Sequence, residues 1–310
     1  ELLRIAARGQ HIRRFDIARS KFPEGRDGYN EWRRTCREHH AKLLREIMSR
    51  HGYDSHDIEH VAKLVKKEQL KTLDLSVGCY LIAHPKGVMV WDVGVVPDAT
   101  FPKDGTPGTK AYATATKTLT SQMADAGYSF ADVNYLVLSH YHWDHFGNAA
   151  MFAKSTWLVE KIEHDTLFGP TPPERLTPDQ YLPLAKTKAV YLPNKDYDVF
   201  GDGSVVIKPA YGHTPGHSGY LIESGGKSLL IWGDIIHVPE VQVPRPEVTM
   251  AFDTDPHAAA ATRKRVFDMV VTDRQLIAGM HVHFPGFAHL VKQGDSYMML
   301  PEPWDQGFGG

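Results

Sequence analysis

SHYHWDHFGN, residues 139–148, places four side chains of the kind that bind metals within six positions: His140, His142, Asp144 and His145. The segment directly follows the apolar run VNYLVL, residues 133–138, which is typical of a buried strand. Polar loops at the carboxyl ends of strands often carry the chemistry of α/β proteins. Because imidazole and carboxylate are the usual ligands of zinc and similar ions, this loop is predicted to bind metal. The spacing lets His140 and His142 point one way and Asp144 and His145 another, so one loop could serve two adjacent ions.

The composition is that of an ordinary globular protein, with 310 residues and a formal net charge of −2. This charge gives no reason to expect nucleic acid or an anionic membrane as a partner. The two cysteines exclude a disulfide framework, and no apolar run approaches the roughly 18 residues of a membrane-spanning helix. The first residues, ELLRIAARGQHIRR, lack the long apolar core of a signal peptide, and we therefore expect a cytoplasmic protein.

The chain is predicted to consist of two unlike domains, residues 1–71 and 72–310. The first part is basic, with 17 Lys and Arg against 11 Asp and Glu, and its apolar residues recur at helical intervals in NEWRRTCREHHAKLLREIMSR and DSHDIEHVAKLVKKEQL. The second part alternates short β-rich runs, such as GVMVWDVG and SLLIWGD, with helical stretches such as AAAATRKRVFDMVV. We therefore expect a small all-α segment followed by an α/β domain.

More metal-binding side chains recur downstream, in YGHTPGHSG (His213 and His217), LLIWGDIIH (Asp234 and His237) and GMHVHFPGF (His281 and His283). Together with His-x-His-x-Asp-His at positions 140–145, these segments resemble the ordered motifs of the metallo-β-lactamase superfamily. The run VMVWDVG resembles an earlier motif of that superfamily, in which Asp92 would support the metal loop. The resemblance extends from about Leu73 to the C-terminus.

This resemblance implies an αββα sandwich with two divalent ions, most simply Zn²⁺, at one edge. The first ion would be held by His140, His142 and His213, the second by Asp144, His145 and His281, and Asp234 would bridge them. His217 is expected to be a structural histidine in a Pro-Gly turn. His281 is preferred over His283 because HxxFPGFxH resembles the last-ligand segment of proteins related to methyl parathion hydrolase.

The same resemblance implies a hydrolase in which a hydroxide bridging the two metals attacks a carbonyl carbon or a phosphorus. Asp144 is the expected proton acceptor, and His237 is a second catalytic candidate. Several segments resemble the N-acyl-homoserine lactonase group, a quorum-quenching class of enzymes, whereas others resemble the methyl parathion hydrolase group. Lactonases usually place a tyrosine three residues after the bridging aspartate, where this chain has His237. We therefore predict a lactonase or carboxylic esterase, with phosphotriester hydrolysis as the alternative; a glyoxalase II-like thiolesterase or a nuclease is less favoured.

Two further predictions concern surfaces. The aromatic residues near the motifs are candidates for an apolar substrate wall, although for any single one a position in the core is the better prediction: Trp143, Phe146, Phe284, Phe287 and Trp304. The N-terminal segment resembles an uncharacterised family of helical bacterial proteins, and it could instead serve as a binding module. It is too small to bury much core alone, so it is expected to pack on the hydrolase part or to form a homodimer.

Overall fold

The computed structural model of the chain describes residues 16–66, 76–111, 113–283 and 286–302. The chain forms two compact units, Glu1–Leu73 and Asp74–Gly310, and each is described by itself. The domain boundary predicted between residues 71 and 72 lies outside the described residues.

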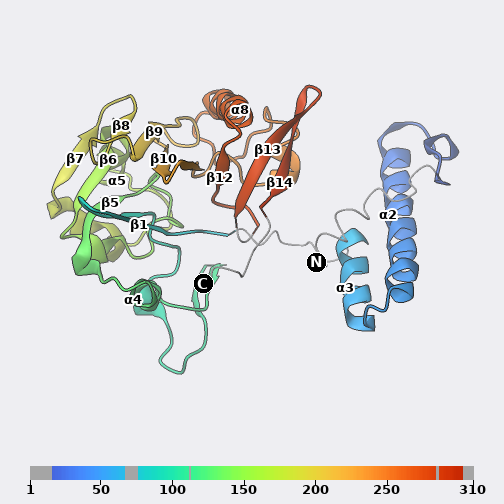
Figure 1. The fold of residues 1–310 in the computed structure, drawn as a ribbon, viewed down its shortest axis with the longest axis horizontal. Helices are drawn as coiled ribbons and strands as arrows, with labels where there is room; N and C mark the ends of the chain where they lie inside the picture. The colour runs from blue at the N-terminus through green and yellow to red at the C-terminus, as the bar shows by residue number, and fades with distance from the viewer. Residues whose placement is uncertain (1–15, 67–75, 112, 284–285, 303–310) are drawn as a thin grey trace. The chain divides into compact units, whose positions relative to one another are not determined.

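The N-terminal unit is a pair of helices that lie side by side, as predicted (Figure 1). Its elements are the 3-10 helix η2 (Arg19–Lys21), α2 (Gly25–Arg50) and α3 (Ser55–Lys66). Asp54 caps α3, because its carboxylate accepts a hydrogen bond from the backbone N–H of Asp57 at 2.9 Å. Leu44 and Met48 of α2 pack against Val61 of α3. Ile47, one of the apolar residues that recur at helical intervals in α2, is 37% exposed.

The C-terminal unit contains two large sheets. The first has the strand order β1-β2-β5-β6-β7, with bounds β1 (Tyr80–His84), β2 (Gly87–Trp91), β5 (Val133–Val137), β6 (Thr156–Glu160) and β7 (Ala189–Leu192). The second has the order β14-β13-β12-β11-β10-β9-β8, with bounds β8 (Tyr197–Asp198), β9 (Val205–Pro209), β10 (Ser218–Ser224), β11 (Lys227–Ile231), β12 (Leu276–Ala278), β13 (Phe287–Gln293) and β14 (Ser296–Pro301). A small hairpin is formed by β3 (Gly108–Lys110) and β4 (Ala113–Ala115).

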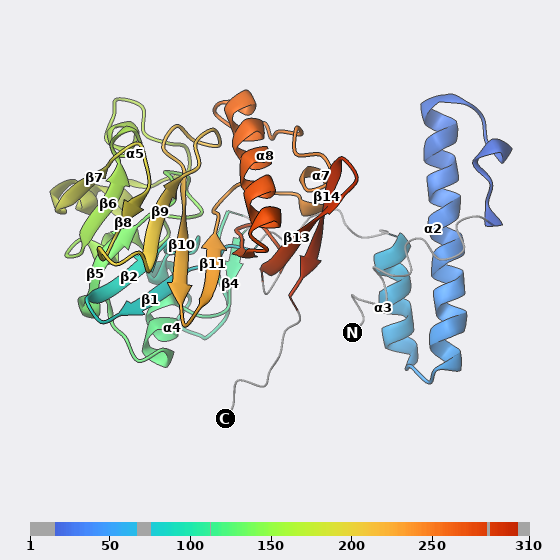
Figure 2. The same cartoon turned by 45° about the horizontal axis from the view of Figure 1, so that its top comes forward.

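Helices cover the outer face of each sheet. The α-helices are α4 (Leu119–Asp125), α5 (Lys161–Leu167), α6 (Pro178–Tyr181), α7 (Pro239–Gln242) and α8 (Pro256–Thr272). The 3-10 helices are η3 (Asp98–Thr100), η4 (Phe130–Asp132), η5 (Ala149–Phe152) and η6 (Leu182–Lys186). Figure 2 shows α8 lying across the second sheet.

Three hydrophobic clusters pack these layers against one another. The first packs α4, α5 and η6 on the first sheet, for example Met123 against Leu136. A second packs α8 on the other sheet, for example Phe267 against Trp232. The third fills the space between the two sheets with residues such as Trp91 and Tyr220, whose ring centroids lie 5.0 Å apart. The unit is therefore the predicted αββα sandwich.

Strand direction gathers several loops at one edge of the sandwich. β2, β5 and β6 are parallel in the first sheet, and β11 and β12 are parallel in the second. The loops after β2, β5, β11 and β12 carry Asp92, residues 139–145, Asp234 and His281. Because the carboxyl ends of parallel strands meet at one edge, the fold brings together residues distant in the sequence.

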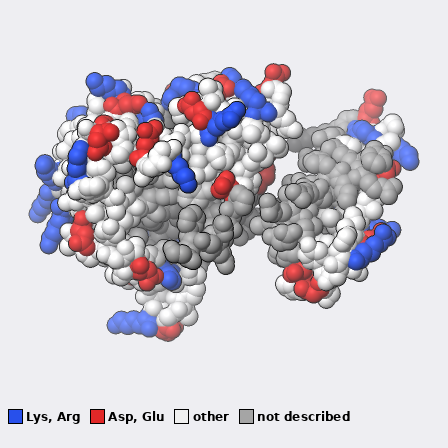
Figure 3. Space-filling model, viewed as in Figure 1, with Lys and Arg blue, Asp and Glu red and all other residues white. Residues whose placement is uncertain are grey.

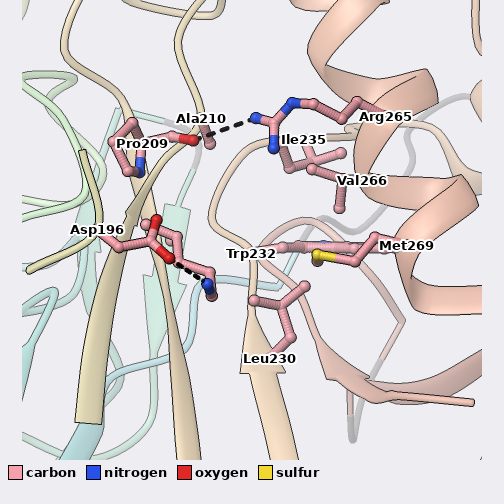
Figure 4. A pocket seen from close by; sticks show the side chains of 11 residues that line it. Asp196, Pro209, Ala210, Leu230, Trp232, Ile235, Arg265, Val266 and Met269 are labelled. Carbon is pink, nitrogen blue, oxygen red and sulfur yellow. Dashed lines mark hydrogen bonds and ion pairs between the residues drawn. The ribbon is translucent and has the colours of Figure 1, made fainter. Parts of the chain in front are cut away.

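A cavity of about 180 Å³ lies between α8 and strands β9 to β11 (Figure 4). Its floor is apolar and includes Leu230 and Trp232, and its rim carries Arg265 and an ion pair between Lys208 and Asp196 at 2.6 Å. None of the predicted metal-binding side chains lines it. The predicted metal-binding side chains therefore lie in the loops and not in this cavity.

Candidate metal centre

Three histidines from two loops turn their nitrogens toward one point. His140 and His142 come from the loop after β5, and His213 from the loop after β9. His142 Nδ1 lies 2.9 Å from His140 Nε2 and 2.9 Å from His213 Nε2, and the two Nε2 atoms lie 3.2 Å apart. Such convergence of three imidazole nitrogens is the donor arrangement of a three-histidine metal site.

A second group lies beside the first. Asp144 and His145 come from the same loop as His140, and His281 follows β12 with a backbone φ of 59°. Asp144 Oδ2 lies 3.5 Å from His281 Nε2 and 3.8 Å from His145 Nε2. His283 does not join either group, because it is half exposed and pairs with Glu240 at 2.7 Å.

Asp234 lies between the two groups and is only 2% exposed. Its Oδ1 is 3.4 Å from His145 Nε2. Its Oδ2 is 2.9 Å from His281 Nε2 and 3.4 Å from His213 Nε2. The structure thus brings together all seven side chains predicted as metal ligands, with one carboxylate shared between the two groups.

Polar neighbours fix the far side of several histidine rings. Asp92 is fully buried at a positive φ of 52°, and its Oδ2 lies 2.7 Å from His145 Nδ1. Ser139 lies beside both groups, donating to Asp92 at 2.8 Å, with His140 Nδ1 2.9 Å from the same hydroxyl. Asp253, which the sequence did not single out, holds His213 Nδ1 at 2.9 Å. Such partners fix the tautomer and orientation of metal-binding histidines.

Burial leaves His140 and His142 suited to a metal. Burial lowers the pKa of His142 to about 2 and that of His140 well below its usual value, so both rings are neutral. Burial alone would raise the pKa of Asp234, but neighbouring His281 and His145 hold it well below its usual range. Among the described side-chain atoms, buried His145 Nε2 and Asp234 Oδ1 lack a hydrogen-bond partner. Unsatisfied buried atoms are costly, and a cation between them would satisfy both, so the residues fit a bound divalent ion.

His217 has a different role from the other histidines. Its Nε2 accepts a hydrogen bond from the backbone N–H of Asp234 at 2.9 Å, and its Nδ1 lies 2.9 Å from the carbonyl oxygen of Ala210. Both ring nitrogens are therefore used by the backbone, as expected of a structural histidine. Gly233, at φ 61°, makes this possible, because a Cβ there would lie 2.5 Å from His217 Nε2.

Gly233→Ala is expected to destabilise the protein by more than about 2 kcal/mol, since it combines backbone strain with a clash against a ring that cannot move. Gly226→Ala is the matched control, because Gly226 has φ 74° and nothing within 4 Å of an added Cβ. Strain alone predicts a loss of about 1 kcal/mol there. Chemical denaturation of both variants measures the difference, and equal losses would contradict the contact with His217.

His237 and Phe252 border the centre. His237 Nε2 lies 3.1 Å from Asp234 Oδ2, its ring stacks on His281 at 4.9 Å, and burial lowers its pKa to about 4. Phe252 is 47% exposed, and its ring centroid lies 4.6 Å from that of His237. An exposed aromatic ring beside the predicted metal ligands is a candidate substrate contact that no motif indicated.

The predicted aromatic wall is only partly formed. Phe146 is 1% exposed in the core under the first sheet, and Phe287 packs between the sheets, so both are core residues, the preferred prediction for each, and neither forms the wall. Phe284 and Trp304 lie outside the described residues. Trp143 is half-buried in the metal loop, with Lys110 Nζ 5.8 Å and the Arg175 guanidinium 5.7 Å from its ring.

Residues 73–281 match the family model described as the metallo-beta-lactamase superfamily, and residues 1–79 match a domain of unknown function, DUF4202. The chain belongs to the metallo-beta-lactamase superfamily. The match at the N-terminus agrees with the predicted resemblance to an uncharacterised family.

Among curated proteins, an N-acyl homoserine lactonase of Bacillus cereus is 26% identical over 243 residues, which span 74% of this chain and 87% of that protein. N-acyl homoserine lactonase AttM of Agrobacterium fabrum is 31% identical over 168 residues, 51% of this chain and 64% of that protein.

Solved structures share the fold. AidC, described as a dizinc quorum-quenching lactonase in complex with a product, has a TM-score of 0.61 at 21% identity, covering 75% of this chain and 81% of that one. The hydrolase AbOPH of the beta lactamase superfamily has a TM-score of 0.61 at 25% identity, covering 80% and 88%. In the part of the chain that the structure describes, no helix has both the length and the apolar character needed to span a membrane.

Proposed function

We propose that this metal-dependent hydrolase opens lactones or cleaves other carboxylic esters with two divalent ions, zinc by preference. The first ion would be held by His140, His142 and His213 and the second by Asp144, His145 and His281, with Asp234 shared. The observation that supports this most strongly is the position of Asp234, whose two oxygens face histidines of both groups at 3.4 Å or less. Relatives named as lactonases support the choice of substrate class.

When bound, two such ions supply a water that is acidic near neutral pH and an electrophile for the attacked oxygen. The chain contributes the remaining groups. Asp144 is only partly buried, with 18% of its side chain accessible. It can therefore accept a proton at the centre and pass it to solvent. Neutral His237 carries one N–H, which faces Asp234 Oδ2 at 3.1 Å; once the ions take both oxygens of Asp234, this N–H could donate to the oxygen of the scissile carbonyl.

His237→Phe tests the second of these roles. The variant keeps a ring of similar size against His281 and Phe252 but loses the N–H. We expect kcat/KM to fall by about 10-fold to 100-fold, as for loss of one transition-state hydrogen bond, while both metal ions stay bound. Steady-state kinetics with elemental analysis of the same sample measure this. Loss of an ion in this variant would instead indicate that His237 is a metal ligand. The geometry also permits this, because His237 lies within reach of a common ion with His213 and Asp234.

A phosphotriester is the second candidate substrate, and His237 favours it. Lactonases usually have a tyrosine at this position, whereas the resemblance to methyl parathion hydrolase includes a histidine. The test is a panel of a homoserine lactone, an aryl ester and methyl paraoxon with the metal-loaded protein. Turnover of lactone or ester above that of methyl paraoxon supports the proposal, and the reverse order favours the phosphotriesterase.

Nucleic acid is not the proposed substrate. On the face drawn in Figure 3, blue and red side chains are interspersed along the top of the larger part. Nuclease activity therefore stays a minor alternative. Thiolesterase activity also stays a minor alternative. Cytoplasmic location and a homodimer formed through the N-terminal unit stay predictions.

A further inference from the structure

A buried glutamate outside the predicted ligand set contacts both loops that carry the first histidine group. Glu163 lies in the first turn of α5 and is 4% exposed. Its Oε2 accepts a hydrogen bond from the backbone N–H of Tyr141 at 2.8 Å. Its Oε1 accepts from the Thr214 hydroxyl and from the Gly216 N–H, both at 2.7 Å.

The positions of these donors matter. Tyr141 lies between His140 and His142 in the loop after β5. Thr214 directly follows His213 in the loop after β9. Those two strands belong to different sheets. One carboxylate therefore bonds both loops, which come from different sheets of the sandwich. These are the two loops whose histidine nitrogens converge on one point.

The surroundings of Glu163 are specific for a carboxylate. All three partners are donors, and an ionised carboxylate only accepts hydrogen bonds. Among the described residues, no Lys, Arg or His forms an ion pair with it, so the charge is stabilised by these donors alone. Burial raises the pKa of Glu163 to about 7, in keeping with a site that lacks a cation. The fit is also close, since a Cβ on Gly216 would lie 2.6 Å from Glu163 Cγ.

We propose that Glu163 is a positioning residue for the first metal ion, holding the loop of His140 and His142 in register with the loop of His213. This inference rests on the proposed two-metal function. It assigns Glu163 no contact with substrate or metal. It acts through its hydrogen bonds to the backbone and to Thr214. It should therefore affect the binding of the first ion more than that of the second.

Glu163→Gln is the sharpest variant. Glutamine preserves the volume and offers one oxygen, which can still accept from Thr214 and Gly216. Its NH2 then faces the N–H of Tyr141, so a donor meets a donor and the loop between His140 and His142 loses its anchor. Thr214→Val is a second, milder variant, because it removes only one donor and leaves the carboxylate in place.

Glu160→Gln is the matched control. Glu160 is also a buried carboxylate, 5% exposed and one helical turn away, but its hydrogen bond comes from the Tyr211 hydroxyl at 3.0 Å. A glutamine oxygen can accept that bond equally well. Among the described residues, Glu160 forms no hydrogen bond or ion pair with the loop of residues 139–145, so its replacement should leave metal binding unchanged.

The experiment measures the affinities of the whole chain for zinc by competition with a chromophoric chelator. We expect Glu163→Gln to weaken one of the two ions by about 10-fold to 100-fold, the usual effect of losing an outer partner of a metal site. Thr214→Val should weaken the same ion less, and Glu160→Gln should match the wild type. Unchanged affinity for the other ion shows that the variant is folded.

Wild-type affinity for both ions in Glu163→Gln and Thr214→Val would overturn the inference. So would an equal loss of both ions, which would make Glu163 a general support of the fold. If the wild-type chain itself binds fewer than two zinc ions, the two-metal proposal fails first, and this result is distinguishable because it appears without any substitution.

Discussion

Asp234→Asn is expected to abolish hydrolysis and to release metal at the same time. The side chain is buried, and its two oxygens face three histidines of the two groups. Asparagine keeps the shape but replaces one anionic oxygen by an NH2, which cannot bind a cation. Since loss of an outer partner already costs up to about 100-fold, loss of this shared ligand should exceed that in both affinity and kcat/KM.

The measurement is elemental analysis and steady-state turnover on the same preparation of Asp234→Asn. Asp196→Asn is the control. This exposed carboxylate lies at the rim of the cavity between α8 and strands β9 to β11, and it pairs only with Lys208 among the described residues. A variant of Asp234 that retains both ions and more than a tenth of the wild-type activity would show that Asp234 is not shared between them.

Asp92→Asn is expected to have the next largest effect, although Asp92 does not face the centre. Its Oδ1 accepts from the Ser139 N–H at 2.7 Å, and its Oδ2 bonds the Ser139 hydroxyl and His145 Nδ1. An asparagine that keeps the bond to the Ser139 N–H turns its NH2 toward His145. His145 Nδ1 must then accept, so the ring proton moves to Nε2 and blocks the nitrogen that faces Asp234.

For Asp92→Asn we expect about 10-fold to 100-fold weaker binding of the second ion and a similar loss of turnover. Stability should fall by about 1 to 3 kcal/mol, because a buried partner is left unsatisfied. Chelator competition and denaturation separate the two effects. Selective weakening of the first ion, with the second unaffected, would contradict the assignment of His145.

The sequence predicts most of the fold because its elements have strong local patterns. The runs GVMVWDVG, VNYLVL and SLLIWGD became β2, β5 and β11, and the stretch around AAAATRKRVFDMVV became α8. Strands β12 to β14 were not predicted. β12 spans only three residues, and β13 and β14, the last two strands at one end of the sheet, mix polar and apolar positions. Ile47 shows a further limit, because a helical pattern marks a face without stating how far the partner helix covers it.

The seven predicted ligands could be found because they occur in compact motifs with a fixed order. Their supports could not. Asp253 lies 40 residues after His213, and Glu163 bonds residues 22 and 51 positions away. Only the three-dimensional arrangement places a lone acidic residue beside a loop so distant in sequence. Phe252 was missed for the same reason, as a single aromatic residue outside every motif.

The most direct test of two ions shared by Asp234 is the metal content of the purified wild-type chain, measured together with its activity. We predict about two zinc ions per chain, with lactone or ester turnover that a chelator abolishes and added zinc restores. One ion per chain, or turnover that persists after both ions are removed, would contradict the account.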